Sequence, residues 1–149
     1  RLPDKSREAE WFDSQGQRFI RSGDVGRLDE DGFIVLGDRK KDMIITGGFN
    51  VYPSDIEEVL AQHPHVAECA VVGVPSEQWG ETPVAYVVPR AGTEPQAGAE
   101  LRDWLNARVG KTQRVAALHW VEHLPRSEIG KVLKRQLREQ YLRALPVAD

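Results

Sequence analysis

Residues 67–74 read AECAVVGV, and residues 84–88 read VAYVV. Both runs are apolar and rich in valine, a β-branched residue that packs well on the pleated surface of a sheet. They predict two strands that pair with each other across a surface loop from Pro75 to Pro83. A third run, from Leu118 to Val121, predicts another strand. The sequence is therefore organised around a small sheet of about three strands.

Helical patterns flank these strands. Ser54 and Glu57 have the spacing of a capping box, and the apolar residues after them recur at helical spacing as far as about His63. A second helix is expected to end at Gly110, and an amphipathic pattern predicts a final helix from Val132 to Tyr141. Segments 92–98 and 125–130 are expected to be loops. Helices that alternate with a few strands predict an α+β domain, a small sheet with flanking helices.

The N-terminal part of the chain is organised differently. Phe19–Asp24 and Phe33–Leu36 predict two short strands, and Asp31-Gly32 between them is a hairpin signal. The charged run 38–42 is followed at once by apolar residues, a change in composition that marks a domain boundary. We therefore expect a short β-hairpin before residue 38 and the α+β domain after residue 42.

Composition narrows the function. A chain of 149 residues with 40% hydrophobic and 29% charged residues is typical of a folded globular domain. The net charge of -3 provides no overall basic field, so we expect no extensive binding to nucleic acid or to an anionic membrane. No apolar run reaches the ~20 residues that a transmembrane segment needs. Any anion site must therefore be local.

Cysteine and histidine content argues against two kinds of site. Cys69 is the single cysteine, which excludes an intramolecular disulfide and a cysteine-based zinc cluster and favours a reducing, cytoplasmic setting. Its apolar surroundings predict burial rather than reactivity. The four histidines lack the partners of a ligand set, so the sequence predicts no metal site in this chain.

Three segments carry the candidate chemistry. Residues 21–26 read RSGDVG, and the carboxylate of Asp24 offers acceptors suited to a vicinal diol, although Ser-Gly-Asp alone is more simply a turn. Residues 37–57 read GDRKKDMIITGGFNVYPSDIE, where Arg39 offers a fixed fork of donors and Gly47-Gly48 lets the backbone approach a thin ligand. Residues 124–135 read LPRSEIGKVLKR and contain Lys131, which in isolation is simply a solvated lysine.

In this order, the three segments resemble the adenylate-forming enzymes: acyl-CoA and aryl-CoA synthetases, luciferases and the adenylation domains of peptide synthetases. The resemblance covers roughly residues 19–135 and is most specific at 37–57, with Ser22 where threonine is commoner. It implies the C-terminal portion of an acyl-CoA synthetase, similar to fatty-acid–CoA ligases. Residues 1–38 would be a remnant of the large ATP- and acyl-binding domain, 39–42 the hinge, and 43–149 the mobile lid domain.

The resemblance also implies roles for the residues of the first two segments. Asp24 would accept hydrogen bonds from the ribose hydroxyls of ATP, and Arg39 would contact the ribose or a phosphate. Lys41 would occupy the hinge about which the lid swings. Gly47 and Gly48 would line the tunnel for the pantetheine arm of CoA.

Lys131 is the implied catalytic residue, because the family's terminal motif ends in a lysine that bridges the substrate carboxylate and the α-phosphate. Trp79 would pack against the nucleotide end of CoA, although a loop tryptophan equally serves packing. Lys111 and Arg114 would contact the CoA 3′-phosphate. The segment after them, 115–118, departs from the lysine- and proline-bearing pattern of the family.

The implied reaction has two steps. A carboxylic acid and ATP give an acyl-adenylate and pyrophosphate, and CoA then displaces AMP to form the thioester. Mg²⁺ would accompany ATP and be held by the large N-terminal domain, the expected partner of this chain. No Ser/Thr/Gly-rich phosphate loop followed by lysine occurs, so the chain alone is expected to be inactive. The alternatives are an adenylation domain that loads a carrier protein and a non-catalytic interaction module of the same fold.

Overall fold

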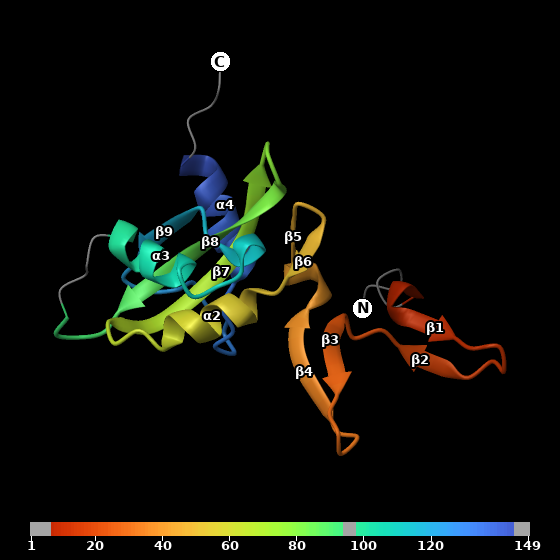
Figure 1. Ribbon diagram of the computed structural model, residues 1–149. Coiled ribbons are helices and arrows are strands. Elements are labelled where there is room, and N and C mark those ends of the chain that lie inside the picture. The colour runs from red at the N-terminus through yellow and green to blue at the C-terminus, as the bar shows by residue number, and fades with distance from the viewer. Residues whose placement is uncertain (1–6, 94–97, 145–149) are drawn as a thin grey trace. The chain divides into compact units, whose positions relative to one another are not determined.

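The structure, a computed structural model, describes residues 7–93 and 98–144 (Figure 1). The chain divides into two compact units, Arg1–Lys41 and Asp42–Asp149. The predicted hinge at 39–42 stays a prediction, as do the domain limits on either side of it.

The described part of the first unit holds two antiparallel hairpins. Strand β1 (Glu10–Phe12) pairs with β2 (Arg18–Ile20), and β3 (Asp24–Leu28) pairs with β4 (Ile34–Arg39). The predicted hairpin around Asp31-Gly32 is present as β3–β4. Its predicted first strand was wrong, because Phe19 belongs to β2 and pairs with Trp11 instead. Gly23, at φ +78°, separates β2 from β3 because it takes a backbone conformation that ends an extended strand.

The second unit is built on a mixed sheet with the strand order β6-β5-β8-β7, and β9 pairs with β8 as well. The predicted valine-rich pair is confirmed: β7 (Val66–Ser76) and β8 (Gly80–Pro89) form a long antiparallel ladder. Its ends reach Ser76 and Gly80, so the connecting loop is shorter than the predicted one. The third predicted strand, β9 (Ala117–Trp120), runs parallel to β8. Two short strands, β5 (Ile44–Thr46) and β6 (Phe49–Val51), extend the sheet.

The three predicted helices are present as α2 (Pro53–Ala61), α3 (Gly98–Asn106) and α4 (Lys134–Ala144). Helix α3 ends before the predicted stop at Gly110. Short 3₁₀ turns η1 (Lys40–Asp42) and η2 (Lys111–Gln113) are also present. The predicted capping box at Ser54 was wrong. Helix α2 begins after Tyr52, which makes no side-chain cap hydrogen bond, and Pro53 fixes the first-turn φ. The loop predicted at 92–98 lies partly outside the described residues.

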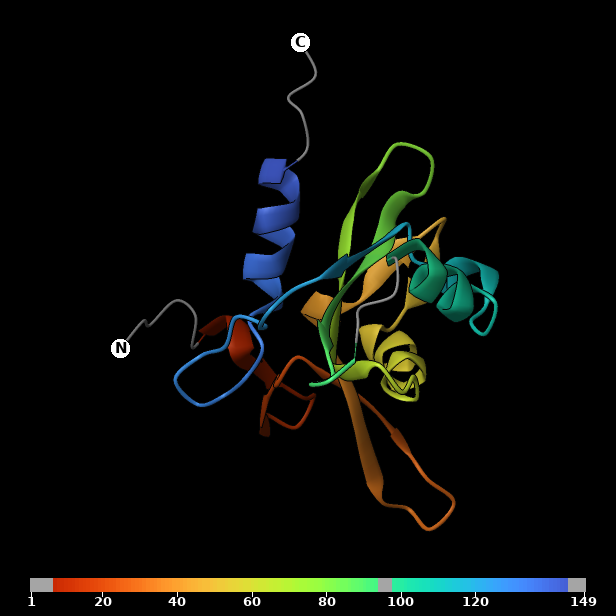
Figure 2. The same cartoon turned by 90° about the vertical axis from the view of Figure 1, so that its left-hand side faces the viewer.

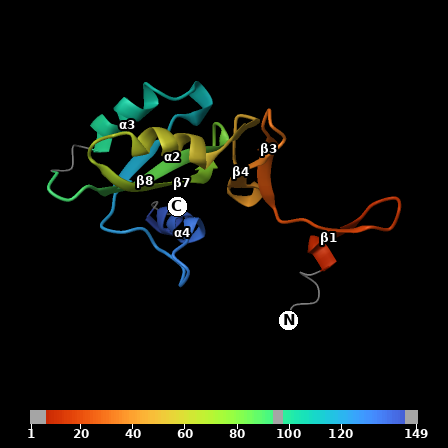
Figure 3. The same ribbon diagram turned by 90° about the horizontal axis from the view of Figure 1, so that it is seen from below.

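The helices bury both faces of the sheet. Figures 2 and 3 show α2 and α3 on one side of β7 and β8, and α4 on the other. Ile56, Leu60, Leu101 and Leu105 are completely buried on the first face, and each such side chain stabilises the fold by about 2 kcal/mol. On the second face, the hydroxyl of Tyr86 donates to the carbonyl of Leu137 at 3.0 Å, which fixes α4 on the sheet.

Cys69 lies half-buried in β7, as the apolar run around it suggested. Its thiol is 3.5 Å from the carbonyl of Glu57, and burial, followed by the nearby Glu57 carboxylate, raises the pKa of the thiol to about 12. A thiol that stays protonated at neutral pH is a poor nucleophile. The structure therefore gives Cys69 a packing role. Of the helices in the described ranges, none is long and apolar enough to cross a membrane.

Candidate functional site

In the first unit, Asp24 and Arg39 lie opposite each other in the β3–β4 ladder. The Nε atom of Arg39 is 3.3 Å from Oδ1 of Asp24, and both side chains are partly exposed. The structure thus brings together the two residues that the resemblance assigns to the nucleotide. An adjacent pocket of ≈ 290 Å³ is lined by Ser22, Gly23, Arg39, Lys40 and Lys41. Because an exposed ion pair contributes little to stability, a bound nucleotide could displace it at small cost.

In the second unit, Gly47 and Gly48 form the turn between β5 and β6. Their φ angles of +57° and +82° lie in the left-handed region that favours glycine. The N–H of Gly47 donates to the carbonyl of Trp79 at 2.8 Å. A Cβ atom on Gly47 would lie only 3.0 Å from Cε3 of Trp79, so the indole ring rests directly on the glycine backbone. Two predicted site elements are therefore in contact.

Beside this turn lies a pocket of ≈ 560 Å³. It forms where the neighbour of β8 changes: β9 pairs with Val84–Val87, whereas β5 reaches β8 only at Gly80. The strand residues between these pairings leave room for a ligand at the sheet edge. Its lining consists of Thr46, Ser76, Gln78, Trp79, Thr82, Lys111, Thr112, Arg114, Val115 and Ala116. The pocket therefore unites Trp79, Lys111 and Arg114, which are far apart in the sequence.

The charge of this pocket is positive. Lys111 and Arg114 are exposed, and neither forms an ion pair with any residue that the structure describes. Thr82 and Thr112, which bear hydroxyls, line the pocket beside them. Lysine and arginine are the preferred partners of phosphate, and hydroxyls add neutral donors. The arrangement suits a phosphorylated ligand with an aromatic group that can stack on Trp79.

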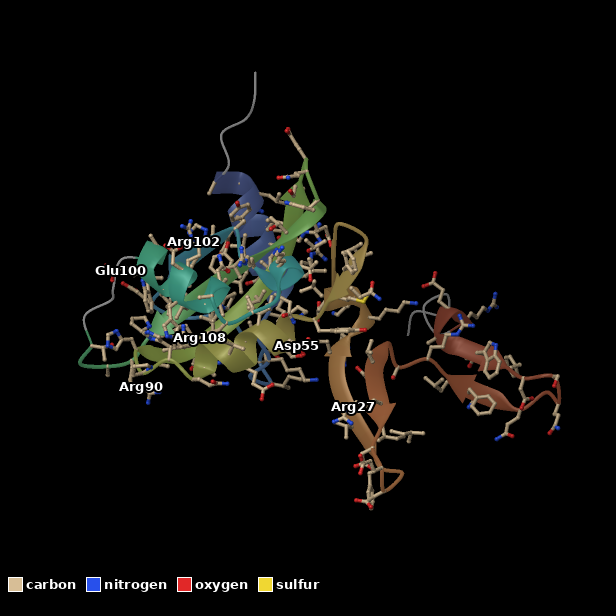
Figure 4. All side chains as sticks on the ribbon, viewed as in Figure 1. Arg27, Asp55, Arg90, Glu100, Arg102 and Arg108 are labelled. Carbon is tan, nitrogen blue, oxygen red and sulfur yellow. The ribbon has the colours of Figure 1, made fainter. Side chains whose placement is uncertain are left out.

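The wall that carries the two cations is held in place by hydrogen bonds. Gln113 accepts from the N–H of Gly110 at 3.0 Å and donates to Asp55 at 3.4 Å; Asp55 lies near the N-terminal end of α2 (Figure 4). Asn106 makes two bonds to the backbone of Val115, at 2.8 and 3.0 Å. These supporting hydrogen bonds were not predicted from the sequence. The Gly110-x-x-Gln113 spacing, which resembles a capping box, was the available signal for one of them.

Lys131 lies in a tight loop before α4. Its carbonyl accepts from the N–H of Ser127 at 2.8 Å, and its own N–H donates to Oγ of Ser127 at 3.2 Å. Gly130, at φ +81°, turns the chain back, and Val132 forms a β-bridge with Arg126. The side chain of Lys131 is exposed and has no ion pair with another described residue. The final helix begins at Lys134, later than predicted, because this bridge occupies Val132.

The Lys131 loop and the pocket lie at different ends of β7. Arg126, in the loop, pairs with Glu68 near the start of the strand, whereas Ser76 at its end lines the pocket. Ser76 follows Glu68 by eight positions along the extended strand, a length of about 26 Å. The two candidate elements are therefore built as separate sites on one rigid sheet.

No group of three or more His, Cys, Asp or Glu side chains in the described ranges is arranged to hold a metal ion. The resemblance assigns Mg²⁺ to the large N-terminal domain, and this assignment stays a prediction. So do the individual roles of Asp24, Arg39, Gly47, Trp79 and Lys131.

The chain belongs to the family of AMP-binding enzyme C-terminal domains, which it matches over residues 55–131. It is 44% identical over 117 residues to a 2-succinylbenzoate–CoA ligase from Geobacillus kaustophilus, covering 78% of this chain and 24% of that relative. It is 40% identical over 140 residues to a fatty acid–[acyl-carrier-protein] ligase from Streptomyces coeruleorubidus, covering 94% of this chain and 26% of that relative.

The fold is shared as well. A solved structure of a fatty acyl CoA synthetase from Mycobacterium tuberculosis matches with a TM-score of 0.71 at 39% identity, covering 97% of this chain and 27% of that one. The chain thus spans about a quarter of the length of these relatives. The α+β fold and the resemblance to the C-terminal portion of acyl-CoA synthetases are confirmed.

Proposed function

We propose that the chain is the mobile lid of an ATP-dependent carboxylic acid–CoA ligase, which forms an acyl-adenylate and then an acyl-CoA thioester. The observation that carries this proposal is the pocket of Trp79, Lys111 and Arg114 beside the Gly47-Gly48 turn. It combines an aromatic surface, a bare glycine backbone and two cations that form no ion pair within residues 7–93 and 98–144. The name of the 2-succinylbenzoate–CoA ligase, a relative of this chain, supports CoA as the ligand.

CoA fits this pocket chemically. Its adenine ring can stack on the half-exposed indole of Trp79. Its 3′-phosphate can take charge-assisted hydrogen bonds from Lys111 and Arg114. The thin pantetheine arm would then pass over Gly47 and Gly48, where a side chain would obstruct it. In this arrangement the thiol of CoA reaches the reaction centre along the Gly47-Gly48 turn of the lid.

Lys131 would serve the first step. Its exposed ammonium can lie between the substrate carboxylate and the α-phosphate of ATP, where it compensates negative charge while the new bond forms. Such a pre-organised contact typically contributes on the order of 100- to 1,000-fold in rate. Asp24 and Arg39, paired at 3.3 Å, would bind the ribose and a phosphate of the same nucleotide.

Rotation about Lys41 would alternate the two sites. The Lys131 loop and the CoA pocket are held at different ends of β7, whose stretch from Glu68 to Ser76 is about 26 Å long. A rigid lid cannot place both on one reaction centre at the same time. Moving the lid between steps therefore brings Lys131 to the carboxylate first and the glycine turn to the adenylate afterwards.

We propose a fatty acid as the acyl substrate, because a fatty acyl CoA synthetase and a fatty acid–[acyl-carrier-protein] ligase are among the similar proteins. The second of these favours one alternative, in which the acyl group passes to a carrier protein instead of free CoA. Both acceptors carry the same phosphopantetheine arm. A carrier protein lacks the 3′-phosphate that Lys111 and Arg114 would bind.

The full-length protein that contains this chain tests the proposal. It is incubated with ATP and a series of fatty acids, and AMP release is measured with free CoA and with a phosphopantetheinylated carrier protein. We expect CoA-dependent AMP release. Faster loading of the carrier protein would support the alternative, and absence of acid-dependent AMP formation with any acceptor would contradict both. The isolated chain, which lacks a phosphate loop, is expected to be inactive in the same assay.

A further inference from the structure

We propose that Arg126 is a positioning residue that fixes the backbone on which Lys131 stands. Its guanidinium joins Glu68 on β7 to the carbonyl of Gly130, the residue before Lys131. This inference rests on the proposed function of Lys131 and goes beyond it, because it names the group that holds the lysine in place.

The geometry is that of a two-pronged bridge. Nη1 of Arg126 donates to the carbonyl oxygen of Gly130 at 2.6 Å, and Nη2 pairs with the carboxylate of Glu68. The carbonyl of Gly130 and the nitrogen of Lys131 belong to one planar peptide unit. Fixing that oxygen therefore fixes the orientation in which the Lys131 side chain leaves the backbone.

This bridge matters because the tip of the loop is held mainly by short backbone contacts within the loop itself. Ile129 at the tip is 77% exposed, so the tip gains almost nothing from apolar burial. Gly130, at φ +81°, is the most flexible type of residue and directly precedes Lys131. The other described contacts within the loop are neutral: hydrogen bonds with Ser127, the β-bridge between Arg126 and Val132, and a bond of 2.7 Å from the N–H of Leu133 to the carbonyl of Pro125. A bond from a charged donor is roughly twice as strong as a neutral one.

The other end of the loop is held to the same strand. Lys134, at the start of α4, pairs with Glu57 at 2.8 Å, and the same carboxylate accepts the N–H of Val71 in β7 at 2.7 Å. Lys131 is therefore suspended between two attachments to β7, one through Arg126 and Glu68 and one through Lys134 and Glu57. The Arg126 bridge is the attachment that contacts the peptide unit of Lys131 itself.

The test separates the two half-reactions in the full-length enzyme. Adenylation is followed by ATP–pyrophosphate exchange, and thioester formation by the reaction of supplied acyl-adenylate with CoA. We expect Arg126→Ala to lower kcat of adenylation about 100-fold with little change in KM for ATP, because a misplacement of about 1 Å costs on that order. Thioester formation should be unchanged. Arg126→Lys should recover little, because an ammonium lacks the fork that spans both acceptors.

Arg135→Ala is the matched control. It removes the same charge four residues after Lys131, from an exposed ion pair with Glu139 at 2.8 Å, and has no contact with Gly130 among the described contacts. We expect it to adenylate at the normal rate. Equal rates for Arg126→Ala and Arg135→Ala, or an equal loss of both half-reactions in Arg126→Ala, would overturn the inference.

Two further results keep this inference distinct from the proposed function. If the unmodified enzyme does not adenylate, or Lys131→Ala adenylates normally, the proposed role of Lys131 fails. If Lys131→Ala is inactive and Arg126→Ala is fully active, the positioning role alone fails. Independently of activity, hydrogen–deuterium exchange of amides 130–133 should accelerate in Arg126→Ala and not in Arg135→Ala, and unchanged exchange would contradict the bridge.

Discussion

Replacing Gly47 or Gly48 by alanine is expected to destabilise the chain by unequal amounts. Both residues have a positive φ, +57° and +82°, so a Cβ is strained at either position. Their surroundings differ. A Cβ on Gly47 would lie 3.0 Å from Cε3 and 3.4 Å from Cζ3 of Trp79, whereas a Cβ on Gly48 would have nothing within 4 Å. Comparing the two substitutions therefore distinguishes the effect of backbone strain from the effect of the contact with the indole ring.

The expected magnitudes follow from these two causes. The left-handed conformation costs an alanine about 1 kcal/mol, which is the whole effect expected for Gly48→Ala. Gly47→Ala must also displace the ring of Trp79. The lower end of the usual cost of overpacking, about 1 kcal/mol, applies here, because the half-exposed ring of Trp79 can move aside. We therefore expect a loss of about 2 kcal/mol for Gly47→Ala.

Denaturant unfolding of the isolated chain measures both losses of unfolding free energy. Thermal unfolding should show a decrease in Tm of roughly 3 °C for Gly48→Ala and roughly 6 °C for Gly47→Ala. The ring contact is isolated by repeating both substitutions in a Trp79→Ala background, where the difference between them should vanish. Equal destabilisation by the two single substitutions would refute the reasoning, as would a difference that persists without Trp79. CoA binding should weaken more for Gly47→Ala, since Trp79 lines the proposed CoA pocket.

Three further outcomes are expected. The hydroxyl of Thr46 is buried with no hydrogen-bond partner among the described residues, so Thr46→Val should raise the unfolding free energy by about 1 kcal/mol, and a loss in the same denaturant assay would count against this. Burial, followed by the nearby positive charges of His65 and Arg108, lowers the pKa of His63 in the folded chain. As the pH drops below 6.5, the unfolded chain therefore takes up this proton before the folded chain does, and the unfolding free energy should fall. The dependence of the unfolding free energy on pH should be weaker in His63→Phe. Removing Lys111 and Arg114 together should abolish an affinity preference of about tenfold for CoA over dephospho-CoA, measured by calorimetry; an intact preference would place the 3′-phosphate elsewhere.

Much of the fold follows from local patterns. The valine-rich runs of β7 and β8 could be recognised as strands because β-branched residues dominate both. Strands β5 and β6 contain three residues each, which is too short for a pattern to distinguish a strand from a loop. Glu57 has the spacing of a capping residue, yet its carboxylate binds Val71 and Lys134, because a long-range charged partner outweighs the local one.

The sequence singled out individual candidate residues, and their geometry could not be predicted from it. Lys131 and Gly47-Gly48 could be singled out from their motifs. The pocket depends on η2 lying beside the β7–β8 turn, a packing relation between distant segments that the single sequence does not reveal. The Arg126 bridge likewise needs Glu68, which precedes it by 58 residues. Such contacts become visible only once the sheet has set the register between its strands.

Lys131→Ala in the full-length protein tests the central claim most directly, with each half-reaction assayed separately. We predict that the rate of acyl-adenylate formation falls by about 100-fold or more. The variant should still convert supplied adenylate and CoA into thioester at the normal rate. If both half-reactions decline together, or neither does, Lys131 does not divide the work of the lid in the way proposed.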